Sequence, residues 1–301
     1  MKNKGILLAL CTAVISGVAV FFNKFASAQF GDPYVFTFLK NAPVAILFLA
    51  IILMPRFWKQ VKALGKKQWF HLLLIGLIGG AIPFLMFFKG LTITSSGNAA
   101  LIHKTLFIWV GILAVIFLKE KFSRYQLLAL PVLFLGSFIL TGFNGWNFGV
   151  GDALVFGATL FWAVEFVLAK KVLRNLSSEI VAWGRMFFGS VFLVIFLAFT
   201  GRGDFISAIN YGNIGWLVLS SALLFGYVFT WYKALKHAPA SVVSIALVPA
   251  FIITVFLNSI FITGVFSLKQ LAVSLLFTGG VFIFLKFRRK ISYEFAIKPT
   301  R

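Results

Sequence analysis

FKGLTITSSGNAALIHKTLFIWVGILAVIFLKEKFSRYQLLALPVLFLGSF, residues 88–138, decides the fold because the same pattern returns, without a gap, 144 positions later. Thirteen of the fifty-one aligned positions are identical. Chance matches of Leu, Ile and Phe are expected in so apolar a chain, so the polar and glycine identities carry the most weight. These identities pair Lys89 with Lys233, Ser123 with Ser267, Gln126 with Gln270, and Gly136 with Gly280. We interpret the two halves of the chain as an internal duplication.

The composition excludes a single soluble domain. Of the 301 residues, 61% are hydrophobic and only 12% are charged, and the mean hydropathy is +1.01. A soluble fold would have to expose most of this apolar surface to water. The single cysteine, Cys11, lies within the first apolar run, so a disulfide framework is not expected. The net charge of +21 is interpreted as a topology signal rather than as a sign of a nucleic-acid partner.

Ten apolar runs are long enough for membrane helices. The hydrocarbon core of a bilayer is about 30 Å thick and needs about 20 residues of helix. The runs cover residues 5–27, 34–54, 69–90, 98–118, 126–142, 152–170, 179–200, 214–234, 240–262 and 268–286. The predicted fold class is therefore all-α and integral to the membrane, with ten transmembrane helices surrounded by the lipid bilayer.

Positive charges gather in every second connection between these runs. With the amino terminus placed in the cytoplasm, twenty of the 28 Lys and Arg residues fall in cytoplasmic segments. The opposite side receives two, Arg202 and Lys269. Because cytoplasmic loops of membrane proteins are enriched in Lys and Arg, the count predicts a multi-pass protein of the inner (cytoplasmic) membrane with both termini in the cytoplasm.

An odd number of spans per repeat makes the second repeat enter the membrane from the opposite face. We expect residues 1–145 to form the first five-helix repeat, 146–290 the second, inverted repeat, and 291–301 a cytoplasmic tail. Toward the start of each repeat the offset becomes 145 or 146, so that Lys40 corresponds to Arg185. Inverted repeats that hold a substrate site between them, near the membrane midplane, are typical of secondary transporters.

One segment resembles a known family. Leu118–Ser123, of sequence LKEKFS, is followed by Gln126 and Gly136. Together with ten spans in two repeats, this pattern resembles the EamA-type branch of the drug/metabolite transporter superfamily over nearly the whole chain. The resemblance implies transport of a small metabolite. It places Glu120 at the glutamate position of the family's motif, and we interpret Glu120 and Ser123 as structural, because such groups can cap the free amides of a helix start.

The fourth span departs from the family pattern. Members commonly carry a proline early in the fourth and ninth spans. Pro249 fills that place in the ninth span, whereas the fourth has His103, Lys104 and Thr105. The resemblance therefore implies transport but leaves the cargo open.

Glu165 is the strongest single candidate for a functional charge. It lies four residues from the middle of the sixth run, which is about 6 Å from the midplane at about 1.5 Å per residue. A charge at such a depth costs about 2.5–3.5 kcal/mol and marks a functional site by default. Glu165 could exchange a proton as the coupling group or balance a cationic substrate. Alternatively, it pairs with Arg185, which the seventh span places at a similar depth.

Two lysines also lie within spans. Lys104, about 6 Å toward the outer side of the fourth span, is interpreted as a cavity contact, with Thr105 beside it. Lys40 and its counterpart Arg185 are interpreted as structural charges that pack between helices or reach the interface. His103 points about 100° away from Lys104, so it is interpreted as a structural hydrogen-bonding residue.

The first span carries a stripe of small and weakly polar residues on one helical face. At spacings of four, three and four, the stripe consists of Thr12, Ser16, Ala19 and Asn23. Its counterparts in the sixth span, at an offset of 146, are Ala158, Trp162, Glu165 and Ala169. We interpret Thr12, Ser16 and Asn23 as lining a cavity; close packing against another helix is the alternative.

Three further side chains are candidates for the cavity wall. Trp162 lies one turn before Glu165, and Trp109 lies about one turn beyond Thr105. Ser244 is a polar candidate in the ninth span. For the two tryptophans, ordinary packing among 39 phenylalanines is the alternative.

The function that these features predict is secondary transport of a small polar or amphipathic metabolite by alternating access. We expect an exporter, with protons as a candidate coupling ion, as a monomer or homodimer. A flippase-type carrier of a lipid-linked substrate is the first alternative, and a non-transporting scaffold or channel is the second. No zinc-protease, nucleophile-elbow or phosphate-loop motif is found, so no enzymatic activity, cofactor or metal ion is expected.

Reporter fusions test the predicted topology. A fluorescent protein that folds only in the cytoplasm should be active when fused after Arg301, and a phosphatase that requires export should be inactive there. Fusion at Arg202 should give the reverse pattern, because its loop is predicted to lie on the opposite face. An active phosphatase after Arg301 would contradict the predicted orientation.

Overall fold

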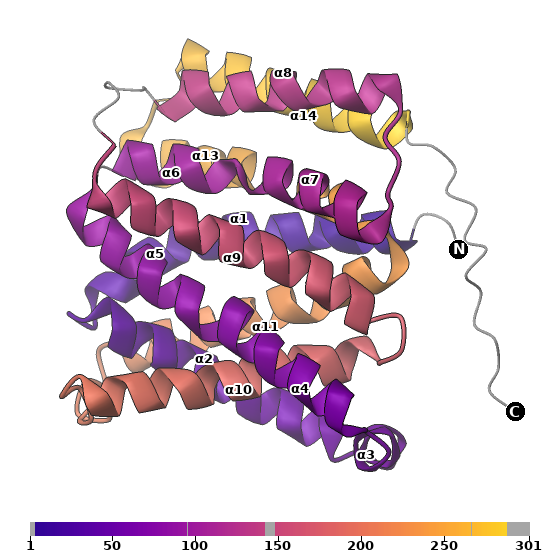
Figure 1. Cartoon of the computed structure of the whole chain (residues 1–301). Coiled ribbons are helices and arrows are strands. Elements are labelled where there is room, and N and C mark those ends of the chain that lie inside the picture. Colours follow the sequence, from indigo (N-terminus) through magenta and orange to yellow (C-terminus); the bar gives the residue numbers. More distant parts are fainter. Residues whose placement is uncertain (1–3, 95, 142–147, 266, 288–301) are drawn as a thin grey trace, which may run out of the picture.

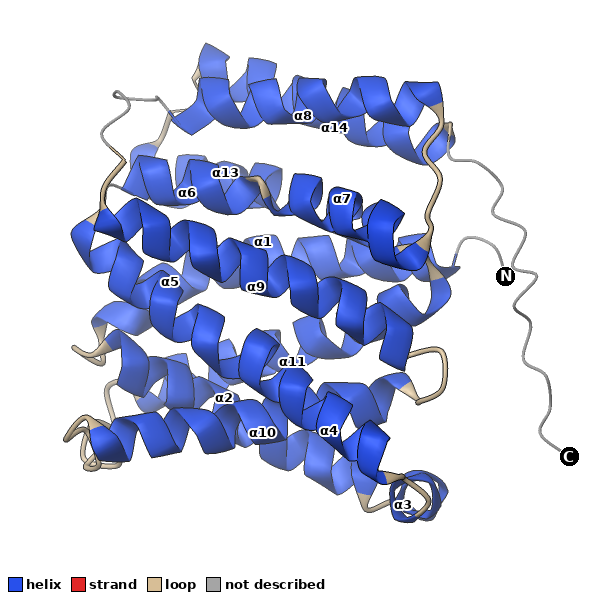
Figure 2. Cartoon of the chain, in the orientation of Figure 1, coloured by secondary structure: helices blue, strands red, loops and turns tan. Residues whose placement is uncertain are grey.

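Helices account for all the regular structure in the described chain. The computed structural model describes residues 4–94, 96–141, 148–265 and 267–287, and no strand occurs among them (Figure 2). The all-α prediction is therefore confirmed. The tail predicted at 291–301 lies outside the described residues.

The first half of the chain forms eight helices and one π-helical segment within the described residues. They are α1 Lys4–Ala28, α2 Pro33–Ile52, α3 Pro55–Lys62, α4 Lys66–Ile75, η1 Gly76–Ala81, α5 Ile82–Ile93, α6 Ser96–Lys104, α7 Leu106–Leu118 and α8 Arg124–Thr141. The π-helical segment η1 joins α4 and α5 into one long apolar segment. The fourth predicted span is divided at Thr105 into α6 and α7.

The second half forms six helices and another π-helical segment within the described residues. They are α9 Val150–Val172, α10 Ser178–Phe199, α11 Ile214–His237, α12 Ala240–Ala246, α13 Ala250–Asn258, η2 Ser259–Thr263 and α14 Leu268–Lys286. The ninth predicted span is divided into α12, which ends at Ala246, and α13, which begins at Ala250. Pro249 lies in this break and has no amide N–H to donate to a helical hydrogen bond.

Nine segments of the described chain are long and apolar enough to cross a membrane. The molecule is a multi-pass membrane protein. The remaining predicted span corresponds to α8, an apolar helix whose stretch Arg124–Gly136 is shorter than a full crossing. α8 packs along α14 (Figure 1). The count of ten spans stays a prediction.

Helix packing follows the duplication. α1 packs against α11 in the other half. The counterpart of α1 is α9, and the counterpart of α11 is the segment that ends in α5. α9 packs against α5 in the same way. α2 packs against its own counterpart α10, and α8 packs against α14. Figure 1 places these last two pairs at opposite edges of the bundle. Each half thus buries its apolar faces against the other, which is the two-repeat plan predicted from the sequence.

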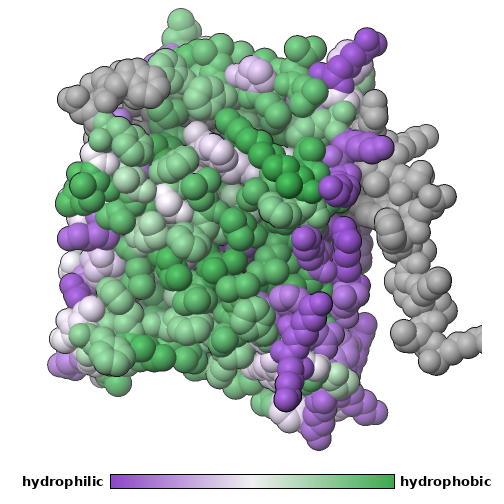
Figure 3. Space-filling view, viewed as in Figure 1, coloured by the Kyte–Doolittle hydropathy of each residue, from purple (hydrophilic) through white to green (hydrophobic). Residues whose placement is uncertain are grey.

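Basic residues form a rim at one end of the bundle. Apolar side chains cover most of the face in Figure 3, and hydrophilic ones gather along its right-hand edge. The elements that end there carry Lys59 and Lys62 in α3, Lys170 and Lys171 in α9, and Lys286 in α14. This basic rim is the end of the molecule that the charge count predicts to face the cytoplasm.

Asp32 fixes the start of α2 and ties it to the loop after α10. Its carboxylate accepts hydrogen bonds from the amides of Tyr34 (2.7 Å) and Val35 (3.3 Å) and from Nε of Arg202 (2.7 Å). Partial burial raises the pKa of Asp32, but Arg202 and the two amides outweigh it, so the pKa lies below its usual value. The cap therefore stabilises the fold at neutral pH, and its contribution is lost as the pH falls through this lowered pKa.

Gly80 is a point of backbone contact between η1 and α10. A Cβ atom there would lie 2.7 Å from the carbonyl oxygen of Arg185 and 2.9 Å from Cα of Gly189. Both neighbours are backbone atoms, so neither can turn aside as a side chain would. The absence of a side chain at Gly80 therefore sets the distance between η1 and α10.

Replacing Gly80 by alanine should separate these two elements and destabilise the protein by about 1–3 kcal/mol, the usual cost of overpacking. Gly279→Ala is the matched control, because a Cβ atom there meets nothing within 4 Å in the described chain, and alanine favours helix over glycine. Thermal unfolding of the purified protein in detergent should show a lower midpoint for Gly80→Ala alone. Equal midpoints for the two variants would contradict the close approach.

Candidate functional site

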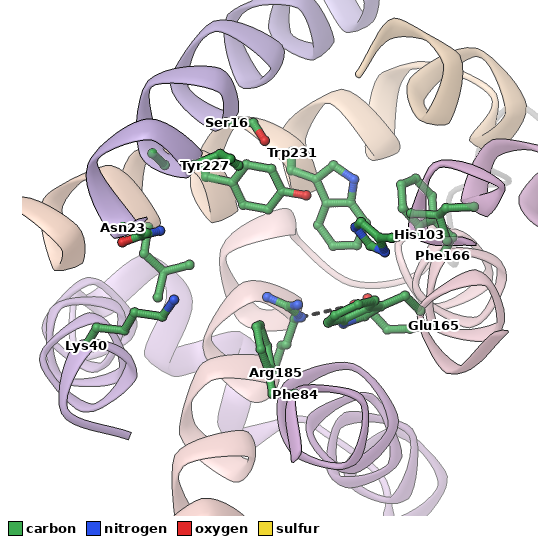
Figure 4. Close-up of a pocket in the computed structure, with 15 residues that line it drawn as sticks. Ser16, Asn23, Lys40, Phe84, His103, Glu165, Phe166, Arg185, Tyr227 and Trp231 are labelled. Atoms are coloured by element: carbon green, nitrogen blue, oxygen red, sulfur yellow. Dashed lines mark ion pairs between the residues drawn. The ribbon is translucent and has the colours of Figure 1, made fainter. Parts of the chain in front are cut away.

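A cavity of about 220 Å³ lies between the two repeats. We call it the central cavity. Helices of both halves contribute to its wall (Figure 4). Its lining residues are Ser16, Ala19, Val20, Asn23, Lys40, Phe84, His103, Leu106, Trp162, Glu165, Phe166, Arg185, Leu224, Tyr227 and Trp231.

A buried ion pair lies on this cavity. Nε of Arg185, on α10, is 3.3 Å from Oε1 of Glu165, on α9, and the two side chains are 6% and 2% exposed. The hydroxyl of Tyr232, on α11, donates to the same carboxylate oxygen at 2.7 Å. A buried ion pair is tolerated only when further hydrogen bonds satisfy its partners, and Tyr232 supplies one of them to Glu165.

The π-helical turn of η1 completes the environment of this ion pair. The amide of Ile82 donates to the carbonyl of Leu77, five residues earlier, so the turn is wider than in an α-helix. The carbonyl oxygen of Gly79 in this turn accepts hydrogen bonds from Nη2 of Arg185 (3.1 Å) and from Nε1 of Trp162 (3.3 Å). The widened turn therefore presents a backbone acceptor to two cavity side chains.

Gly79 also has no room for a side chain. A Cβ atom at this position would overlap Cγ and Cδ of Glu165. The carboxylate of Glu165 is thus held between the backbone of η1, the guanidinium of Arg185 and the hydroxyl of Tyr232. Its position is fixed from three sides.

Lys40 is the second buried cation of the central cavity. Its residue is 7% exposed, and Nζ lies 5.1 Å from the ring centroid of Phe36 and 6.0 Å from those of Phe84 and Phe88. Among the described residues, Nζ has neither a hydrogen-bond acceptor nor a carboxylate within ion-pair distance. In Figure 4, Lys40 and Asn23 lie on the side of the cavity away from Glu165.

Four of the side chains that the sequence suggested for the cavity line it: Ser16, Asn23, Trp162 and Glu165. Lys40 and Arg185, which the sequence suggested as structural charges, line it as well.

Thr12 and Ser244 lie elsewhere. The hydroxyl of Thr12 is 2.8 Å from that of Thr230 and donates to the carbonyl of Leu8, so it belongs to the contact between α1 and α11. Ser244 is buried in α12 and donates to the carbonyl of Ser241 at 3.0 Å. Neither side chain is part of the central cavity.

Lys104, Thr105 and Trp109 also lie outside the cavity lining. Nζ of Lys104 lies 5.2 Å from the ring centroid of Phe251 on α13. Nε1 of Trp109 donates to the hydroxyl of Thr105 at 3.0 Å, and its ring packs edge-on against Phe156. Lys104 and Trp109 thus connect α6 and α7 to neighbouring helices, whereas Thr105, among the described residues, bonds only within the α6–α7 segment.

His103, rather than Lys104, faces the cavity. Its ring packs edge-on against Trp162, with centroids 5.0 Å apart, and against Phe87. Its Nδ1 is buried and has no hydrogen-bond partner in the described chain. The sequence analysis chose Lys104 as the cavity contact and His103 as the structural residue, whereas the structure places His103 in the lining.

Sequence reasoning also missed the aromatic wall that α11 contributes. Tyr227 and Trp231 both line the cavity, and their rings stack with centroids 6.4 Å apart. Their spacing of four residues is the available signal, because it places them on one face of a helix. In a chain with 39 phenylalanines, such spacings are too common to single out a site.

Glu120 and Lys170 hold the corner between α11 and α12. The carboxylate of Glu120 accepts hydrogen bonds from the amides of Ala240 (2.7 Å) and Ser241 (3.2 Å), at the start of α12. Nζ of Lys170 donates to the carbonyls of Leu235 (2.6 Å) and Ala238 (2.7 Å), at the end of α11. We call this arrangement the α11–α12 clasp. An acid at a helix start and a base at a helix end both match the helix dipole.

Ser123 lies at the start of α8. Its hydroxyl oxygen accepts from the amide of Gln126 (3.2 Å), and the Gln126 side chain accepts from the amide of Ser123 (3.0 Å). Ser267 and Gln270 make the same reciprocal pair at the start of α14. The Ser123 hydroxyl also donates to the carbonyl of Phe287, which joins the ends of α8 and α14.

The described residues contain no group of three or more His, Cys, Asp or Glu side chains placed to hold a metal ion. The polar groups of the central cavity are instead suited to binding a small solute by charge, hydrogen bonds and aromatic contact.

Comparison with known proteins identifies the relatives of the chain. The family model described as "EamA-like transporter family" matches it twice, over residues 3–142 and 149–286. An uncharacterized transporter of Archaeoglobus fulgidus is 28% identical over 288 residues, which cover 95% of this chain and 100% of that protein. The riboflavin transporter ImpX of Fusobacterium nucleatum is 28% identical over 229 residues, 70% of this chain and 73% of that protein.

A solved crystal structure shares the fold. It superposes with a TM-score of 0.79 and covers 97% of this chain and 100% of its own. Its sequence identity of 14% supports likeness of fold alone.

The Glu165–Arg185 pair can be tested by its effect on stability. Arg185→Met should lower the free energy of unfolding by about 3–5 kcal/mol, because it leaves a buried carboxylate without its counter-charge. Adding Glu165→Gln should recover most of the loss, since glutamine keeps an acceptor for Tyr232 without a charge. Thermal midpoints in detergent report both effects. A double variant as unstable as Arg185→Met alone would show that the charge of Glu165 is not the cause.

Proposed function

Because the chain belongs to the EamA-like transporter family, we propose that it is a secondary transporter that moves a small polar or amphipathic metabolite across the cytoplasmic membrane by alternating access. A role in transport accords with the names of its relatives and with its many membrane-spanning helices. The central cavity between the repeats carries the proposal, because it combines an ion pair, a second cation and aromatic walls.

The two ends of the bundle differ, which supports alternating access. At the basic rim, Glu120 and Lys170 form the α11–α12 clasp, and Gly5 of α1 leaves no room for a side chain against Ala238. The repeat counterparts of Glu120 and Lys170 are Gly264 and Lys24, and Lys24 is exposed. These two counterparts therefore form no equivalent of the clasp at the other end of the bundle. This difference is consistent with a conformation in which the cavity is closed toward the basic rim.

Glu165 is proposed as the coupling group. Its carboxylate forms the ion pair with Arg185 and accepts a hydrogen bond from Tyr232, so its protonation would weaken the ion pair and release a cation and a hydroxyl inside the cavity. A change of that kind alters the contacts between α9, α10 and α11. Such a difference in contacts is what a coupling ion requires in order to shift a conformational equilibrium.

Orientation and direction complete the proposal. The basic rim is assigned to the cytoplasm, both termini are placed there, and export is the proposed direction. Riboflavin is included among the trial substrates, because one relative is named as a riboflavin transporter.

Flux measurements in proteoliposomes test the function. We expect saturable transport of at least one compound from a panel of amino acids, organic acids, amines and riboflavin, and faster transport when a proton gradient is imposed. Glu165→Gln should abolish the response to the gradient while downhill flux persists, because its side chain cannot ionise. Glu179→Gln is the matched control: this acid pairs with Lys233, away from the cavity lining.

Two outcomes would contradict the proposal separately. A full response to the gradient in Glu165→Gln would remove Glu165 as the coupling group. Failure of every compound to show saturable flux, with folded protein in the vesicles, would favour a scaffold or a carrier of another kind of substrate.

A further inference from the structure

The cluster around Arg185 has a counterpart in the first repeat, and one member of that counterpart is missing. The duplication relates Arg185 to Lys40, Glu165 to Ala19, and Tyr232 to Phe88. Lys40 and Ala19 both line the central cavity, and Nζ of Lys40 lies 6.0 Å from the Phe88 ring. The first repeat therefore keeps the cation and the ring but has a methyl group where the second repeat has a carboxylate.

Lys40 is consequently a cation without its anion. An ammonium group carries three N–H donors, and the described chain offers it the faces of Phe36, Phe84 and Phe88. Ring faces attract a cation but provide no oxygen acceptor. Intramembrane charges are costly unless paired, so this ammonium can bind an anionic partner that the described residues do not supply.

The acid of the cavity is already engaged. Glu165 accepts from Tyr232 and pairs with Arg185, and Figure 4 shows it on the side of the cavity away from Lys40. The charged groups of the lining are thus one neutralised pair and the unbalanced ammonium of Lys40. A ligand that carries a positive charge would find no free carboxylate in this lining.

The rest of the cavity suits a flat apolar body. Phe84, Trp162 and Trp231 contribute rings to the wall, and the rings of Phe84 and Trp162 meet edge to face, with centroids 5.4 Å apart. A volume of about 220 Å³ is small beside the usual range of about 300–1,000 Å³ for ligand sites. A space of this size suits a compound of about one ring with a short side chain.

The geometry points to a small monocarboxylate with a flat apolar body as the ligand of the central cavity, its carboxylate bound by Lys40 next to Ala19. In that position the ligand occupies the place that Glu165 fills in the other repeat, and Asn23, which faces the cavity from the Lys40 side, offers a further polar contact. This inference deepens the proposed function, because it concerns the same cavity.

Three probes that share one ring and a short chain test the charge preference. Calorimetry on the purified full chain in detergent should show saturable binding of phenylacetate. Phenethylamine, which is cationic, and phenylalanine, which carries an additional ammonium, should bind at least about tenfold more weakly, because the charge left unpaired in the lining is a cation. Absence of saturable phenylacetate binding, or tighter binding of phenethylamine, overturns the inference.

Substitutions of Lys40 test the receptor. Lys40→Met should weaken phenylacetate binding by at least about tenfold, the effect of losing a hydrogen bond to a charged group, and Lys40→Arg should retain most of the affinity. Lys89→Met is the control, because Lys89 is an exposed lysine on α5. Thermal midpoints ensure that only folded variants are compared. Unchanged phenylacetate binding by folded Lys40→Met overturns the inference.

Restoring the missing carboxylate provides an independent test. Ala19→Glu should supply an internal partner for Lys40 and weaken phenylacetate binding at least about tenfold more than Ala19→Gln, which adds a side chain of the same length without a charge. Combining Ala19→Glu with Lys40→Met should lower the thermal midpoint below that of Ala19→Glu alone, because the new carboxylate then lacks its counter-charge. Equal losses of binding for the Glu and Gln variants overturn the inference.

Binding and flux separate this inference from the proposed function. Saturable flux of amines without phenylacetate binding would leave transport intact and refute the anion site. Phenylacetate binding that depends on Lys40, together with no flux of any compound, would support the anion site and refute transport.

Discussion

A buried ion pair between Glu165 and Arg185 governs the centre of this structure. Two charges at that depth are stable only where each finds further polar partners, and the chain provides them through the hydroxyl of Tyr232 and the carbonyl of Gly79. The carbonyl is presented by the π-helical turn of η1, and the turn fits against α9 and α10 because positions 79 and 80 have no side chains. The π-helical backbone of η1 is thus explained by the hydrogen bond that its Gly79 carbonyl accepts from the charged side chain of Arg185.

The duplicated fold and the unequal chemistry of its halves have different consequences. Helix packing is exchanged between the repeats almost element for element, so α1 on α11 is matched by α9 on α5. The polar groups do not follow this symmetry: one repeat has Arg185 with Glu165, and the other has Lys40 with Ala19. A symmetric scaffold allows two conformations of similar energy, whereas an asymmetric cavity lets a ligand or an ion favour one of them.

The sequence predicted the helical class, the duplication and most of the membrane segments, because hydropathy and charge are local and repeat with the chain. It could not orient His103 and Lys104, since that depends on how Thr105 divides α6 from α7. The sequence suggested that Glu120 caps a nearby helix start. In the structure, its carboxylate accepts hydrogen bonds from amides that lie 120 and 121 residues further along the chain. Contacts of that kind depend on the packing of distant helices, which no periodicity within one segment encodes.

The α11–α12 clasp shows how such a structure can open without great cost. Its contacts are charged groups placed on helix ends, where Glu120 and Lys170 each satisfy two backbone groups. When the basic rim separates in the proposed cycle, these charges and helix ends pass into water, which satisfies both. The loss of direct hydrogen bonds is then offset by hydration, so the closed and open states differ by far less than the strength of the individual contacts suggests. An apolar seal of the same area would lack this compensation, because its separation would expose hydrophobic surface to water.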